Sequence, residues 1–146
     1  MPITKKGFPN EKVLALAPLA RSLSNQKGTL SLLREKRIVE ARTITRCRYE
    51  NLYWVVGLIE EGEAFARRMA NDDTSHRKHR GQLIFEAGVT FDDEVEDRLR
   101  AWLRNANTRL AGAETLNPKK VASLGGDVGK SYIFYSQLSS DAAHRP

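Results

Sequence analysis

The chain has 146 residues, 40% of them hydrophobic and 29% charged, a balance typical of a folded globular protein. A single cysteine, Cys47, excludes an internal disulfide framework and cysteine-rich zinc sites, which fits a reducing compartment. The net charge of +6 permits acidic partners, but there is no dense Lys/Arg tract and no paired Cys/His module. No apolar run approaches the roughly 20 residues that span a bilayer, so we expect a cytoplasmic protein without a membrane partner.

The first half of the chain predicts a leader followed by a long helical region. Residues 1–10 carry two prolines and a glycine, which predict a loose N-terminal leader. Helical spacing of apolar residues predicts a helix over 11–23, kinked by a proline, and then a turn over 24–28. Thr29 is predicted to cap the longest helix, whose apolar pattern continues to Ile59. Both faces of this helix mix apolar and charged residues, which indicates a central element with neighbours on two sides.

The second half predicts shorter helices. A turn with capping residues is predicted at 71–74, followed by a helix to about residue 87. The clearest helix opens at residues 90–93 and stops at Gly112. Acidic residues crowd its first turns and arginines its later ones, which complements the helix dipole.

The last segment completes the predicted fold. Asn117 begins a short turn of helix, the glycines at 125–126 break it, and Asp127 is predicted to cap the final helix. No segment alternates like a strand over more than a few residues. We therefore predict an all-α helical bundle of about six helices with one long central helical region, forming a single domain over 11–146.

One group of side chains has spacing that could hold a metal ion. Asp72, His76 and His79 would share a face if their helix began early. Cationic residues beside them oppose metal binding, so we expect a solvated surface and no metal. The glycine-rich segment 125–131 is one residue short of a phosphate-binding loop and follows no strand, and we expect no cofactor.

The most informative pattern is polar. Tyr135 and Ser139 lie along one stripe of the final helix, with His144 at its edge, where a core helix would carry Leu or Ile. Arg46 and Glu50 lie one turn apart in the long helix, the spacing of an intrahelical ion pair. An ion pair in a helix buried on two sides must be satisfied, so we expect the final helix to supply its partners.

Two interpretations of this cluster stay open. One is a polar network that fixes helix register, because buried polar groups are hydrogen-bonded whatever their function. The other is a cleft in which Arg46 and Glu50 bind a ligand, with His144 as the leading catalytic candidate and Ser139 and Tyr135 as further ones.

These residues also carry a family resemblance, in the segment Arg46-x-x-x-Glu50 with its aromatic-rich continuation and in the ending Tyr135-x-x-Leu138-Ser139-x-x-x-x-His144. Over about residues 30–144 the chain resembles a bacterial all-helical family of unknown function, near the HEPN and abortive-infection helical proteins. The resemblance implies a helical bundle and a context in phage defence or toxin–antitoxin loci. Relatives continue into a further helix, which implies that the domain over 11–146 lacks a C-terminal helix.

The same resemblance bears on activity. HEPN ribonucleases use an Arg and a His four to six residues apart on one helix, and no arginine occupies those positions before His144. We therefore expect an interaction or regulatory module that forms a homo-oligomer or binds a protein partner. The alternative is a HEPN-like RNA-binding protein or ribonuclease, with arginines binding phosphates.

Overall fold

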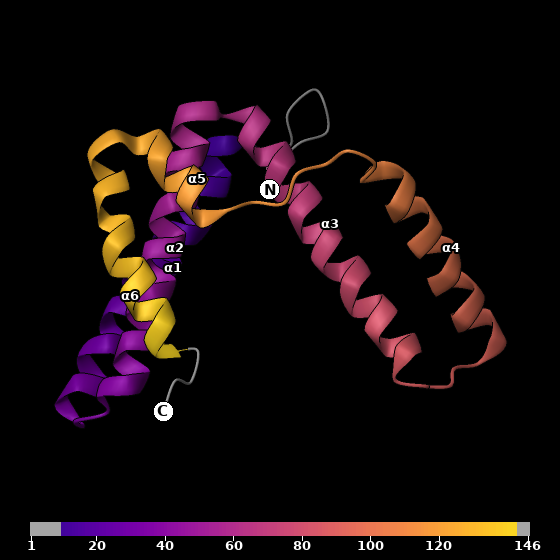
Figure 1. Ribbon diagram of the computed structural model, residues 1–146, viewed down its shortest axis with the longest axis horizontal. Helices are drawn as coiled ribbons and strands as arrows, with labels where there is room; N and C mark the ends of the chain where they lie inside the picture. Colours follow the sequence, from indigo (N-terminus) through magenta and orange to yellow (C-terminus); the bar gives the residue numbers. More distant parts are fainter. Residues whose placement is uncertain (1–9, 143–146) are drawn as a thin grey trace. The chain divides into compact units, whose positions relative to one another are not determined.

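The structure, a computed structural model, describes residues 10–142, with side chains described up to Ser140 (Figure 1). Over these residues it is all-α without a strand, which confirms the predicted fold class. In chain order the elements are α1 (Glu11–Arg34), α2 (Ile38–Glu61), α3 (Glu63–Glu86), α4 (Asp93–Arg109), α5 (Pro118–Ala122), the 3-10 segment η1 (Ser123–Ser131) and α6 (Tyr132–Ala142). α5 has only 5 residues, so the described chain has five long helices rather than six.

The chain divides into two compact units. Arg67–Leu116 forms one unit, and the segments before and after it form the other, whose described residues are 10–66 and 117–142. The expected single domain over 11–146 stays a prediction, which a single cooperative unfolding transition would support. None of the described helices has the length and apolar content needed to cross a membrane.

The centre of the first unit is α2, which packs against α1, α5, η1 and α6 (Figure 1). This confirms the prediction of a central helix with neighbours on two sides. The side chains of Tyr53 and Phe65 are fully buried here. Gly57 is required at this contact, because a Cβ atom there would overlap the Phe65 ring.

The predicted turn over 24–28 is wrong, and so is the helix cap at Thr29. α1 runs unbroken through both. Turn-forming residue types are overridden by packing, because Gly28 faces the Ile44 side chain of α2 and Thr29 is buried. The chain instead turns after Arg34, where Lys36 adopts a left-handed conformation with φ 60°. The long central region is therefore a hairpin of two helices.

In the second unit the predicted turn at 71–74 is also wrong, because α3 continues through it. The Thr74 hydroxyl donates to the Ala70 carbonyl at 2.8 Å, one helical turn earlier. α4 confirms the predicted acidic-to-basic helix that ends before Gly112. α3 and α4 approach each other at Gly81, where an added Cβ atom would lie 3.2 Å from the Leu103 side chain.

The segment before the last helix is partly as predicted. Asn117 caps α5 by accepting the Lys119 backbone N–H at 2.9 Å. Gly126 breaks the helical path with φ 54°, as expected of a glycine at a kink. The predicted cap at Asp127 is wrong, because α6 begins only at Tyr132 and the Asp127 carboxylate pairs with Lys130.

Candidate functional site

The predicted polar residues of α2 and α6 meet. The Arg46 Nε donates to the Ser139 hydroxyl at 3.0 Å, and Arg46 Nη2 donates to Glu50 Oε1 at 2.8 Å and to the Tyr135 hydroxyl at 3.3 Å. Tyr135 in turn donates to Glu50 Oε1 at 2.9 Å. The contact predicted between Arg46/Glu50 and the final helix is thus confirmed for Tyr135 and Ser139, and we call these four residues the Arg46 network.

The network is half-buried rather than fully buried. The side chains of Arg46 and Glu50 are 32% and 28% exposed, whereas Tyr135 is only 7% exposed. The expectation of a buried cluster is therefore too strong, because α6 covers only one side of the ion pair. One edge of the network faces solvent, and a small ligand could reach the charged groups from there.

Burial dominates the acid–base behaviour of Tyr135. Loss of hydration raises the pKa of its hydroxyl, the Arg46 hydrogen bond opposes this, and the bond to Glu50 adds to it. For Arg46, the hydrogen bond to Tyr135 is the largest influence and keeps the guanidinium pKa above its usual value despite partial burial. The Tyr135 phenol therefore keeps its proton over the physiological pH range and bridges Arg46 and Glu50.

An aromatic cluster supports the network from the side of the core. The Tyr135 ring lies edge-on to the Tyr53 ring with centroids 5.7 Å apart, and Tyr132 lies 5.5 Å from Tyr135. The Arg46 guanidinium carbon lies 5.4 Å from the centroid of the Tyr135 ring, within range of a cation–π interaction. Tyr53 shares a hydrogen bond of 3.2 Å with Ser131, just before α6 begins. Rings and hydroxyls together fix the register of α6 on α2.

The hydrogen bonds of Ser139 and Tyr135, two of the three catalytic candidates, show what these side chains can do. The Ser139 hydroxyl donates to the Tyr135 carbonyl at 2.8 Å and accepts from a guanidinium, which cannot act as a base toward it. Tyr135 keeps its proton and donates it in a hydrogen bond to Glu50. His144 lies outside the described residues, so its role stays a prediction. Among the residues whose positions are described, the geometry is that of a structural and ion-pairing network.

The predicted metal candidates are used differently. Asp72 Oδ1 accepts the Leu116 backbone N–H at 2.9 Å and thereby anchors the end of the second unit to α3. Its Oδ2 lies 3.4 Å from His76 Nε2. His79 joins neither of them in a cluster suited to a metal, and over residues 10–142 no group of three or more potential ligands assembles.

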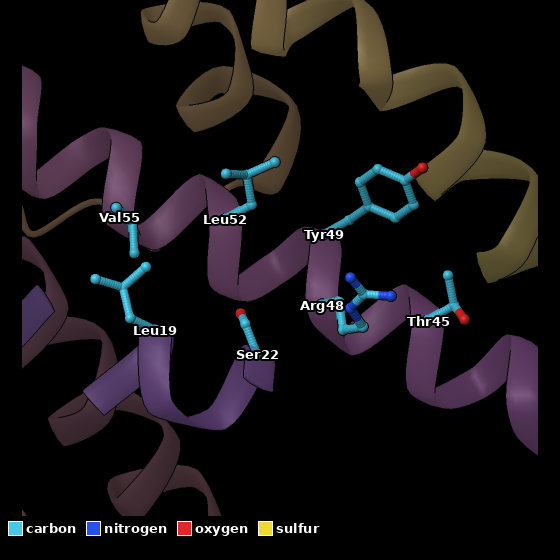
Figure 2. Close-up of a pocket in the computed structure, with 7 residues that line it drawn as sticks. All are labelled: Leu19, Ser22, Thr45, Arg48, Tyr49, Leu52 and Val55. Atoms are coloured by element: carbon cyan, nitrogen blue, oxygen red, sulfur yellow. The ribbon is translucent and has the colours of Figure 1, made fainter. Parts of the chain in front are cut away.

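A hollow of about 300 Å³ that no sequence pattern indicates lies on the first unit, between α1 and α2 (Figure 2). Leu19 and Ser22 of α1 line it from one side, and five α2 residues line it from the other: Thr45, Arg48, Tyr49, Leu52 and Val55. The Arg48 Nε is buried and has no hydrogen-bond partner. A turn at 24–28 would set Leu19 and Ser22 beside residues just after Thr29, whereas the actual turn after Arg34 sets them beside residues 45–55, and the predicted turn therefore concealed the hollow.

Comparison with protein-family models, curated proteins and solved structures yields no match to this chain. The resemblance to the HEPN and abortive-infection helical proteins therefore stays a prediction.

Proposed function

We propose that this protein is a cytoplasmic interaction or regulatory module that self-associates through its apolar helices. The observation that supports this most strongly concerns α1. This helix of 24 residues buries only Pro18 and Thr29, while five of its leucines are 44–69% exposed. Apolar surface of this extent on one helix is typical of a protein-interaction site, because water contact with it is unfavourable.

Sedimentation velocity on the purified chain tests this proposal. Self-association predicts a mass above the 16.5 kDa of one chain, increasing with concentration between about 1 and 100 µM, a range set by the usual strength of specific association. A mass of one chain throughout this range would contradict it.

The Arg46 network is, within this proposal, the ligand site. Its guanidinium and carboxylate are about one third exposed and are oriented by hydrogen bonds with Ser139 and Tyr135, which is the pre-organisation that favours ion recognition. A small anion competing with Glu50 for Arg46 would alter the packing of α6. Thermal shift measurements with inorganic phosphate and acetate, on wild type and Arg46→Met, test this role. Equal shifts for both proteins would remove Arg46 from ligand binding.

The alternative is a HEPN-like RNA-binding protein or ribonuclease that uses His144. The Arg46–Ser139 hydrogen bond supports this alternative. Ser139 lies five residues before His144, where HEPN ribonucleases have their arginine, and in this chain α2 supplies an arginine to that position. A metal-independent RNA cleavage assay compares wild type, His144→Ala and the control His79→Ala. Cleavage lost only in His144→Ala supports the nuclease, and no cleavage by wild type rejects it.

A further inference from the structure

The exposed leucines of α1 follow a regular pattern along the helix. Steps of three, four, three, four and three residues connect six positions: Leu16, Leu19, Leu23, Gln26, Leu30 and Leu33. We call this row the leucine seam. It is the a/d pattern of a coiled coil, in which each apolar side chain inserts between residues of a facing helix.

The seam runs beside the face of α1 that packs against α2. At 100° per residue, Leu16, Leu23 and Leu30 lie about 100–140° around the helix from the buried Thr29, whereas Leu33 lies about 40° from it. Leu23 is 69% exposed and Leu16 is 61% exposed. α1 therefore has one face for its own hairpin and an adjoining apolar row that no other described helix of the first unit packs against.

The spacing of the seam suits a second copy of this chain. The order of steps reads the same in both directions, so two antiparallel α1 helices align every position. Leu16 then faces Leu33 of the second copy, Leu19 faces Leu30, and Leu23 faces Gln26. The same alignment sets the acidic first turn of one α1 near the basic last turn of the other, and it opposes the two helix dipoles.

The available area is sufficient for a stable dimer. A helix of 24 residues is about 36 Å long. The seam of α1 and the adjoining face of α2, which carries the half-exposed Leu52, together form a hairpin face about 20 Å wide, so the two helices offer about 700 Å² per copy. The total of about 1,400 Å² falls within the range of specific, stable interfaces.

The hollow beside the seam adds a polar argument. Leu19 belongs to the seam and also lines the hollow. Figure 2 shows Arg48 of α2 lining the same hollow as Ser22 of α1. The buried Arg48 Nε has no hydrogen-bond partner in the single chain, which is costly. Antiparallel pairing brings Gln26 of the second copy to the level of Leu23, within one turn of Ser22, where its amide oxygen is an acceptor for the part of the Arg48 guanidinium that lines the hollow.

We propose that two copies of this chain form an antiparallel dimer through the leucine seam of α1, with Gln26 of each copy entering the hollow beside Arg48 of the other. This proposal rests on the proposed self-association and specifies its surface and partner. Gln26 is the one polar position of the seam, and this register is favoured because it sets the amide beside the Arg48 hollow, where a hydrogen-bond partner is available.

Matched substitutions test the seam. In sedimentation velocity, Leu30→Glu should weaken the dimer by about 100-fold or more, because each copy would bury an unpaired charge. Leu83→Glu is the control, since Leu83 of α3 is also 46% exposed but lies outside the seam. It should leave the dimer unchanged, and circular dichroism verifies that both variants stay helical.

The outcomes separate this proposal from the broader one. Loss of the dimer in Leu30→Glu alone supports the seam. A wild-type dimer that tolerates Leu30→Glu overturns the seam but leaves self-association intact. A monomeric wild type overturns both proposals.

Crosslinking tests the orientation. In a Cys47→Ser background, Leu23→Cys lies near the two-fold axis and should crosslink through a short bismaleimide. Leu16→Cys should not, because antiparallel pairing separates the two copies of residue 16 by about 25 Å along the helix. Equal crosslinking of both variants would indicate parallel helices and overturn the antiparallel dimer.

Discussion

Removing the Glu50 carboxylate tests the Arg46 network most simply. Glu50→Ala deletes two hydrogen bonds, from Arg46 and from Tyr135, each of which involves a charged group. Such bonds contribute about 1.5–3 kcal/mol when buried, and we reduce this to about 1 kcal/mol each because both members of the ion pair are about 30% exposed. We therefore expect a loss of about 2 kcal/mol, or about 4–8 °C in Tm.

Glu96→Ala is the matched control for this substitution. Glu96 also pairs with an arginine one turn away, Arg100 at 2.7 Å, and both side chains of this pair are more exposed than those of Arg46 and Glu50. The Arg100 guanidinium also lies 4.4 Å from the centroid of the Phe85 ring of α3, a contact that does not involve the Glu96 carboxylate. Its removal should cost about 0.5 kcal/mol. Urea denaturation monitored by circular dichroism measures both losses of unfolding free energy. Equal small losses would refute the reasoning and make the Arg46 network a solvated surface.

Three further predictions follow from individual contacts. Gly57→Ala should destabilise the fold by about 3 kcal/mol or more, because its Cβ would overlap an aromatic ring. Gly28→Ala has room for its Cβ and should be neutral or stabilise the fold by about 0.5–1 kcal/mol. Thermal melts compare the two variants. The pKa of Tyr135 is raised on folding, so its contribution to the free energy of unfolding is complete below pH 10 and is lost above it. In urea titrations at increasing pH, Tyr135→Phe should therefore lose less stability in the alkaline range than wild type. An unchanged pH profile would contradict the assignment. Asp72→Ala should abolish hydrogen-exchange protection of the Leu116 amide without affecting α2, and protection as in wild type would show that another group holds that amide.

The polar contact could be predicted because its signal was local. Arg46 and Glu50 have ion-pair spacing within one helix, and Tyr135 and Ser139 stand where a helix of this length should be apolar. An ion pair next to a core demands partners, and the final helix offered suitable ones. What the sequence could not give was the depth of burial, because that depends on how far α6 covers α2.

The errors arose where tertiary packing overrode residue preference. Residues 24–28 have the composition of a turn, yet Gly28 is placed in the helix by its contact with Ile44. The misplaced break divided α1 and concealed the even spacing of its leucines. The separation of Arg67–Leu116 as a second unit was equally inaccessible, because α3 crosses that boundary as one continuous helix.

The most direct test of the central claim, that the Arg46 network joins the last helix to α2, is a double-mutant cycle. Glu50→Gln, Tyr135→Phe and the double variant are compared with wild type by urea denaturation. The 2.9 Å bond between these side chains predicts a coupling free energy of about 1 kcal/mol. Additive losses, with a coupling indistinguishable from zero, would contradict the account.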